Sequence, residues 1–209
     1  MIGSNFKDDN TALNKENIPF IKAIIMNQIY IVGIVFLMGW TSITMQGCRN
    51  VGGGNYDASL DTIFLGLNFG MKRQEFYDRC MELNKSHQTT QGTQNTSVLY
   101  IDKENFKLPV DMNFYPNFYE DRIYAMPVYF NYKAWAPWNR DLQSDNLLME
   151  VKTLMEKWYG KGFQEKKLNS GKVAFYKIDG PRIITIKMRD EQYVDVLIEN
   201  TRYAQEPKK

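Results

Sequence analysis

The chain has 209 residues, a net charge of +2, 14% aromatic residues and 24% charged residues. This aromatic content is typical of a chain that folds around a core, and so small a net charge does not favour binding to nucleic acid. Two cysteines and one histidine are too few for a disulfide-rich scaffold or for the usual clusters of metal ligands. We therefore expect a folded domain without a metal, a cofactor or a nucleic-acid partner.

A long uncharged run lies near the N-terminus. Lys22 precedes it, and residues 23–48 contain no charged side chain. A charged start, an apolar centre at residues 29–40 and a short polar approach to Cys48 are typical of a secretory signal. A membrane helix is the alternative, because about 20 apolar residues span a bilayer. Residues 1–47 are thus predicted to be a signal peptide or a membrane anchor.

The residues around Cys48 resemble a bacterial lipoprotein signal. Gly47 is the small residue that precedes the lipidated cysteine in that family, and Met45 stands where leucine or a similar residue is usual. The looser form of this signal is similar to that of Bacteroidetes lipoproteins. The resemblance implies cleavage before Cys48, lipid attachment there and a place in the cell envelope. Because Arg49 follows instead of acidic residues, it favours the periplasm-facing side of the outer membrane. An uncleaved anchor and a cleaved signal without lipid remain as alternatives.

A glycine-rich stretch follows the cysteine, and residues 48–61 are predicted to form a flexible tether. A lipid-anchored domain needs such a tether to stand away from the bilayer. The folded domain is then expected over residues 62–205.

Two helices are predicted from apolar residues at helical spacing. The stripe of the first helix, over residues 72–85, consists of Phe76, Cys80 and Leu83, widened by Tyr77 and Met81. The second helix begins near Ser144, and its stripe consists of Leu147, Leu148, Val151, Leu154, Met155 and Trp158. Glycines at positions 160 and 162 are its stop signal.

Strand-like runs follow each helix. Those of the first half lie at residues 97–101, 110–115 and 122–132, and those of the second at 173–178, 182–188 and 193–199. Pro127 in the third run indicates an edge strand, a bulge or a break. Asp179-Gly180 between two β-rich runs predicts a tight hairpin. Together the patterns predict an α+β fold. Two helix-plus-three-strand units, over 62–135 and 140–201, form an antiparallel sheet covered by helices.

Two short phrases accompany this element order. Residues 67–76, LNFGMKRQEF, lead into the first helix, and residues 157–162, KWYGKG, end the second. Phrases and element order together resemble the β-lactamase inhibitory protein fold and the small outer-membrane-assembly lipoproteins. The resemblance implies tandem helix-plus-sheet repeats and a non-enzymatic role in binding another protein.

Ten aromatic residues gather between positions 114 and 138. Their simplest role is to form the sheet core and aromatic pairs across strands. The alternative is a binding surface, since tryptophans in a proline-containing loop either cover the core or anchor a ligand. The candidate binding residues are Tyr129, Tyr132, Trp135 and Trp138. If no bulge intervenes, strand alternation puts Tyr129 and Tyr132 on opposite faces.

Catalytic residues are not singled out by any spacing in the chain. His87, the single histidine, lies in a polar loop, and no Gly-x-Ser-x-Gly elbow is present. The leading hypothesis is a non-enzymatic cell-envelope lipoprotein whose domain binds a protein or an envelope component. The first alternative is an envelope protein that binds a carbohydrate or small ligand through the aromatic loop 129–138. The second is an envelope hydrolase, which needs paired carboxylates across a cleft.

Overall fold

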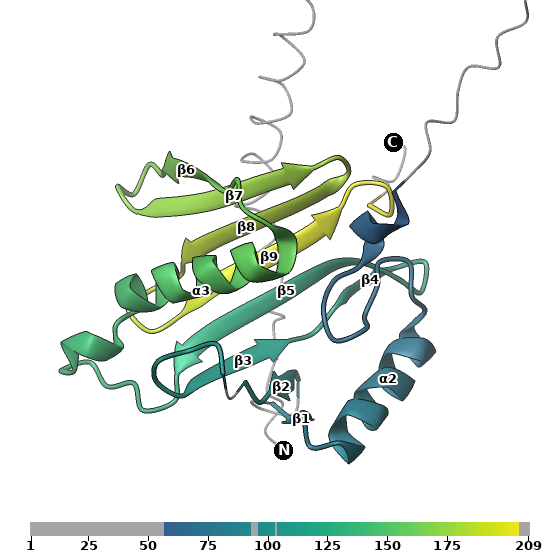
Figure 1. Cartoon of the computed structure of the whole chain (residues 1–209), viewed down its shortest axis with the longest axis horizontal. Helices are drawn as coiled ribbons and strands as arrows, with labels where there is room; N and C mark the ends of the chain where they lie inside the picture. Colours follow the sequence, from purple (N-terminus) through teal and green to yellow (C-terminus); the bar gives the residue numbers. More distant parts are fainter. Residues whose placement is uncertain (1–56, 93–95, 103, 205–209) are drawn as a thin grey trace, which may run out of the picture. The chain divides into compact units, whose positions relative to one another are not determined.

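One antiparallel sheet joins both halves of the domain in the computed structural model, which describes residues 57–92, 96–102 and 104–204 (Figure 1). Within these ranges the sheet has nine strands, in the order β1-β2-β3-β5-β9-β8-β7-β6, and β4 pairs with β5. Two α-helices, α2 and α3, accompany the strands in the same ranges. The fold is therefore mixed α+β. The predicted signal or anchor, residues 1–47, lies outside the described residues.

The bounds of the elements agree closely with the predicted runs. The helices are α2 (Arg73–Lys85) and α3 (Ser144–Tyr159), with the 3-10 helices η1 (Ala58–Asp61) and η3 (Arg140–Leu142). The strands are β1 (Thr89–Gln91), β2 (Val98–Tyr100), β3 (Val110–Phe114), β4 (Asn117–Tyr119), β5 (Arg122–Tyr132), β6 (Gln164–Lys167), β7 (Val173–Asp179), β8 (Arg182–Met188) and β9 (Val194–Asn200). The prediction of three strands per unit is wrong, because β1, β4 and β6 were not foreseen.

The two predicted units share this one sheet. The last strand of the first half, β5, pairs antiparallel with the last strand of the second half, β9. From that central pair the strands of each half extend outward, to β1 at one edge and β6 at the other. The two halves therefore meet strand to strand, with β1 and β6 at the two ends of the strand order.

Pro127 lies inside β5, which is a central strand and not an edge strand. On one side it faces Leu197 of β9. On the other side, β3 pairs with β5 as far as Val128, and β4 pairs from Ala125. Pro127 thus falls in the gap between two partner strands, where its missing N–H costs no ladder hydrogen bond. Of the three predicted explanations, the edge strand and the break are wrong, because β5 is central and continuous. The register of β4 on β5 does shift between Asn117 and Phe118, so a bulge-like irregularity lies close to Pro127.

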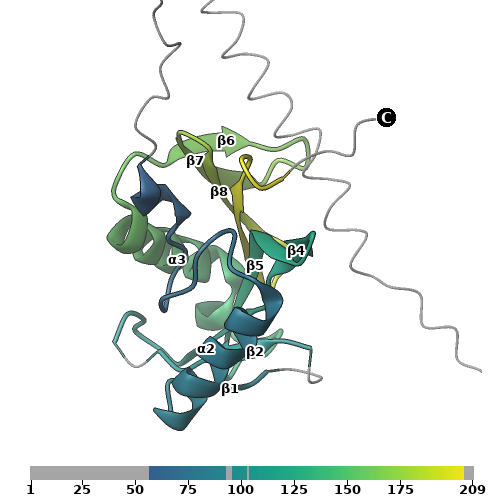
Figure 2. The same cartoon turned by 90° about the vertical axis from the view of Figure 1, so that its right-hand side faces the viewer.

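Helix α3 packs its apolar stripe onto the sheet. Leu147, Val151 and Met155 are fully buried, and α3 contacts β5, β8 and β9. Figure 2 shows α3 to one side of β5 and β8. The helix ends at Gly160, whose φ of 81° is readily adopted by glycine and costly for other residues. Among the strands, helix α2 packs mainly against β1.

The chain enters the domain through a segment that precedes α2. The Tyr159 hydroxyl donates a hydrogen bond to the carbonyl of Ile63 at 2.6 Å, and the Asn200 amide donates to the Asp61 carboxylate at 3.1 Å. Leu67 is fully buried in the core. Residues 57–61, the end of the range 48–61 that was predicted to be a tether, therefore belong to the folded domain and contain η1; residues 48–56 lie outside the described residues.

Candidate functional site

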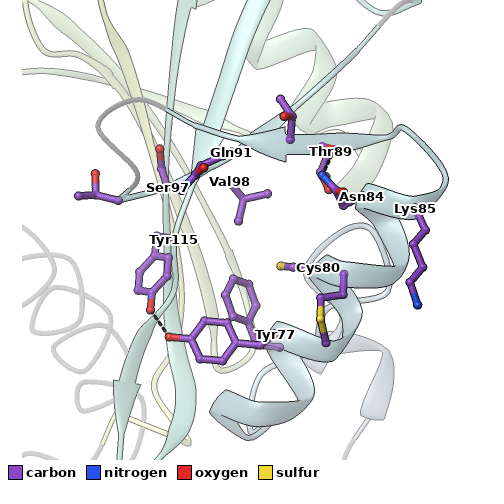
Figure 3. Close-up of a pocket in the computed structure, with 13 residues that line it drawn as sticks. Tyr77, Cys80, Asn84, Lys85, Thr89, Gln91, Ser97, Val98 and Tyr115 are labelled. Carbon is purple, nitrogen blue, oxygen red and sulfur yellow. Dashed lines mark hydrogen bonds between the residues drawn. The ribbon is translucent and has the colours of Figure 1, made fainter.

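A groove of about 400 Å³ separates α2 from the first strands of the sheet (Figure 3). One wall is α2, and the other is formed by β1, the start of β2 and the residue that follows β3. This volume lies within the range of ligand pockets, which are usually apolar with a few polar groups at defined positions. The groove is therefore the candidate site of this domain.

The helix wall is a partly packed apolar strip. It consists of Phe76, Tyr77, Cys80 and Met81, which lie along one side of α2 at helical spacing, and the polar Asn84 follows at its end. Phe76 is fully buried, whereas Tyr77 is 39% exposed and Met81 is 55% exposed. The strip thus extends from the core into accessible space along the groove.

The strand wall includes the backbone of an edge strand. Thr89, Thr90 and Gln91, all of β1, line the groove together with Val98. Successive side chains of a strand point to opposite faces. Three consecutive lining residues therefore mean that the edge of β1 borders the groove. The Asn84 side chain of α2 donates a hydrogen bond to the Thr89 carbonyl at 3.1 Å, so part of this edge is already satisfied.

Two tyrosines close one end of the groove. The hydroxyls of Tyr77 and Tyr115 lie 2.8 Å apart, and Figure 3 shows this hydrogen bond. The ring of Tyr115 also packs edge-on against Phe76, with 5.7 Å between ring centroids. Burial, followed by the hydrogen bond to Tyr77, raises the pKa of Tyr115. This end of the groove is consequently polar, and the guanidinium of Arg73 lies close to both hydroxyls.

Cys80 projects from α2 into the space between helix and strands (Figure 3). Burial raises the pKa of its thiol to about 11. The thiol is therefore protonated at neutral pH, and a protonated thiol is a poor nucleophile. Cys80 acts here as a small apolar group, so the chemistry of this wall favours binding over covalent reaction.

A single charged side chain, Lys85, is found among the lining residues of this groove. It belongs to the last turn of α2. In Figure 3 it extends away from the space between helix and strands. The interior of the groove is thus neutral, with a flexible cation at its rim.

The predicted aromatic residues of β5 are separated by the sheet. Tyr132 is 2% exposed, and its hydroxyl donates to Glu150 of α3 at 3.3 Å. Tyr129 lies on the opposite face, where its ring meets Tyr193 edge-on at 6.0 Å. Its hydroxyl is 3.2 Å from Oγ of Ser97. The two tyrosines therefore follow the predicted strand alternation and do not share a surface.

The two tryptophans of the predicted loop also differ. Trp135 packs against the core, and its buried Nε1 has no hydrogen-bond partner among the described residues. Trp138 is 84% exposed. Since Tyr132 is buried and Tyr129 faces the other way, the structure does not bring the four predicted residues together in one surface. Trp138 alone is fully accessible.

Three further expectations concern the anchor and metal binding. Cys48, the predicted lipidation site, lies outside the described residues. In the described ranges, histidine, cysteine, aspartate and glutamate form no group of three that could hold a metal ion. None of the helices described has the length and apolarity needed to cross a membrane.

The groove was not predicted from the sequence, although one signal was present. Tyr77 and Met81 make the apolar stripe of α2 wider than its buried positions Phe76 and Leu83 require. A stripe wider than its core contacts indicates a second apolar contact. The other wall could not be predicted, because β1 is a short polar stretch without the alternation of a half-buried strand.

Comparisons with protein-family models, with curated proteins and with solved structures give no match for this chain. What the groove binds is therefore inferred from its own side chains and backbone, and where the protein resides from the residues around Cys48.

Proposed function

We propose that this protein is a lipid-anchored cell-envelope protein whose domain binds another protein or an envelope component without catalysing a reaction. One observation carries the binding role: the groove between α2 and β1 offers accessible apolar side chains beside the edge of a sheet. The lipoprotein-like residues Met45, Gly47 and Cys48 support the anchor. In this proposal the acylated Cys48 holds the domain at the outer membrane, facing the periplasm.

The groove favours a binding partner for a physical reason. Met81 and Tyr77 expose apolar surface to water, and covering that surface is favourable. Hydroxyl and amide groups at the rim, such as those of Thr90 and Gln91, can orient a ligand by hydrogen bonds. Accessible apolar strips with polar rims are typical of interaction sites.

The anchor is tested by metabolic labelling with radioactive palmitate. The Cys48→Ala variant is expected to lose the label and to leave the membrane fraction. The Cys80→Ala variant removes the other cysteine and is expected to keep both. Label retained in Cys48→Ala, or lost equally in both variants, contradicts lipid attachment at Cys48.

The binding role is tested by pull-down from solubilised envelope with the anchor intact. Met81 of α2 and Met149 of α3 are 55% and 53% exposed, so they form a matched pair. A partner is expected to be retained by the wild type and by Met149→Glu, and to be lost by Met81→Glu. Equal capture by all three proteins contradicts the assignment of the groove.

A second candidate function is carbohydrate binding, which the 84% exposure of Trp138 favours. Exposed tryptophans stack on sugar rings, and truncation removes that contact. Retention of the wild type on immobilised envelope glycans, with loss of retention in Trp138→Ala, is the expected result for this function. Unchanged retention in Trp138→Ala removes it.

A further inference from the structure

We infer that the groove takes an extended peptide segment, which adds as a strand to the free edge of β1 alongside α2. The inference rests on the proposed binding function and specifies its partner. That partner is an uncharged segment with apolar side chains at alternate positions, followed by an acidic residue. Four features of the groove lead to it.

The first feature is the direction of the β1 backbone. The N–H of Gly92 donates to the carbonyl of Ser97 at 2.8 Å, so Gly92 points its backbone groups toward the β2 side. In an antiparallel ladder the residues alternate between pointing toward and away from the partner strand. Gln91 and Thr89 therefore direct their N–H and C=O groups away from β2, toward the groove side of the edge.

The second feature is how little of this edge is satisfied. The Thr89 carbonyl accepts from Asn84 at 3.1 Å. The N–H of Thr89 and both backbone groups of Gln91 have no partner among the described residues of the groove. The outward backbone groups of Thr89 and those of Gln91 are separated by about 7 Å, the repeat of two strand residues. A peptide strand carries donors and acceptors at this same repeat, so it can pair with all of them.

The third feature is the apolar strip above the edge. A strand added to β1 directs every second side chain toward one face. On that face lie Cys80 and Met81 of α2, and Val98 of β2 lines the same groove. Apolar side chains at alternate positions of the peptide cover this strip, and the intervening side chains face the other way. Backbone pairing and side-chain burial thus act on the same segment.

The fourth feature is charge. Lys85 is the one charged residue among those that line the groove. A charged side chain inside the segment would be buried beside neutral groups at a high desolvation cost. An acidic residue just beyond the segment can pair with Lys85, whose long side chain reaches in several directions. Charge complementarity therefore specifies a neutral segment with an acidic flank.

An acyl chain is the other occupant that this apolar groove could hold. It would cover Cys80 and Met81, but it carries no donors or acceptors for the backbone of Gln91. The unpaired edge of β1 consequently favours a peptide. Binding of a fatty acid is one of the outcomes that the test must separate.

The test begins with the full-length protein in nanodiscs and a phage-displayed library of short random peptides. Enriched peptides are expected to alternate apolar and uncharged polar residues and to carry an acidic residue at one end. Binding of a selected peptide is then measured by fluorescence anisotropy. Absence of enrichment, or enrichment of peptides without this pattern, overturns the inference.

Backbone pairing is tested with two N-methylated versions of the selected peptide. Each version is methylated on one of the two alternating sets of amides. Methylation of the amides that face β1 is expected to weaken binding by about tenfold or more, while methylation of the other set is expected to have little effect. Equal effects of the two sets overturn strand addition. Displacement of the peptide by palmitate, with no effect of either methylation, assigns the groove to an acyl chain instead.

Variants of the protein complete the test. Gln91→Pro removes an outward N–H that the β1–β2 ladder does not use, and it is expected to weaken peptide binding by about tenfold. Met81→Glu is expected to weaken it as well, and Met149→Glu is the matched control. If Met81→Glu loses its partner in the pull-down but binds the selected peptide normally, strand addition fails while the binding function stands. If both measurements are unaffected, both proposals fail.

Discussion

Replacing Glu199 by glutamine is expected to stabilise the protein at neutral and higher pH. Glu199 lies in β9, directly opposite Ala125 of β5 and Ile183 of β8. Neither neighbour can compensate a negative charge. Burial accordingly raises the pKa of Glu199 from 4.5 to about 7. Glutamine has nearly the same shape and is never charged, so it removes this cost.

The sign of the effect follows from proton binding. Between pH 4.5 and about 7 the folded protein keeps a proton on Glu199 that the unfolded chain has already released. The free energy of unfolding therefore falls as pH rises through this window, and the Glu199 contribution is constant on either side of it. A pKa shift of one unit corresponds to about 1.4 kcal/mol, which limits the fall in the free energy of unfolding to about 3 kcal/mol. Partial solvent exposure of the side chain reduces the expected value to about 1–2 kcal/mol.

The assay is urea unfolding of the purified full-length protein at several pH values from 5 to 8. The stability difference between Glu199→Gln and wild type is expected to grow by about 1–2 kcal/mol across this range. Glu165→Gln, on the exposed edge strand β6, makes the same chemical change without burial. A difference that stays constant with pH, or that grows equally for Glu165→Gln, refutes the reasoning.

Three further substitutions probe packing. Tyr159→Phe leaves the Ile63 carbonyl without its donor and is expected to cost about 1–3 kcal/mol of unfolding free energy; an unchanged melting temperature contradicts that bond. Gly92→Ala brings a Cβ within 2.3 Å of Oγ of Ser97, so we expect a lower melting temperature and altered amide shifts in β1 and β2; a wild-type spectrum contradicts this close approach. Phe76→Ala empties a fully buried site and is expected to cost about 3–5 kcal/mol; a loss below about 1 kcal/mol in urea unfolding contradicts its core position.

Much of the second half was predictable because its elements have strong local signals. Asp179-Gly180 predicted a hairpin, and Asp179 pairs with Arg182 across it, with Gly180 at a φ of 55°. A positive φ at this turn is what glycine supplies most readily. The stripe of α3 likewise matches buried residues such as Leu147, because helical spacing reports directly on one buried face.

The edge strands were not predictable, because their sequences carry no such local signal. β1 and β6 are polar, and β6 reads Gln-Glu-Lys-Lys. Such residues form strands because a neighbouring strand pairs with them, not because their own pattern indicates burial. Charged residues on an edge also discourage pairing with other chains, which fits β6. β1 lacks charges, and this contrast with β6 is consistent with the proposal that a partner strand pairs with β1.

The candidate site was not predicted, because none of the four candidate binding residues lines the groove. The aromatic-rich region does form core and cross-strand contacts, as the simplest interpretation stated, and Tyr132 is buried. The alternative interpretation expected residues of this region to form one binding surface, but Tyr129 and Tyr132 lie on opposite faces of β5. The groove instead joins α2 and β1, whose proximity depends on how the chain turns after Lys85. A contact between a helix side and a strand edge leaves no pattern within either segment.

Photo-crosslinking in living cells is the most direct test of the groove as the binding site. A photoreactive amino acid is placed at Met81 in the groove or at Met149 on α3, two methionines of similar exposure. A discrete crosslinked product from position 81 and none from position 149 is the predicted result. No product from position 81, or the same products from both positions, would contradict the assignment.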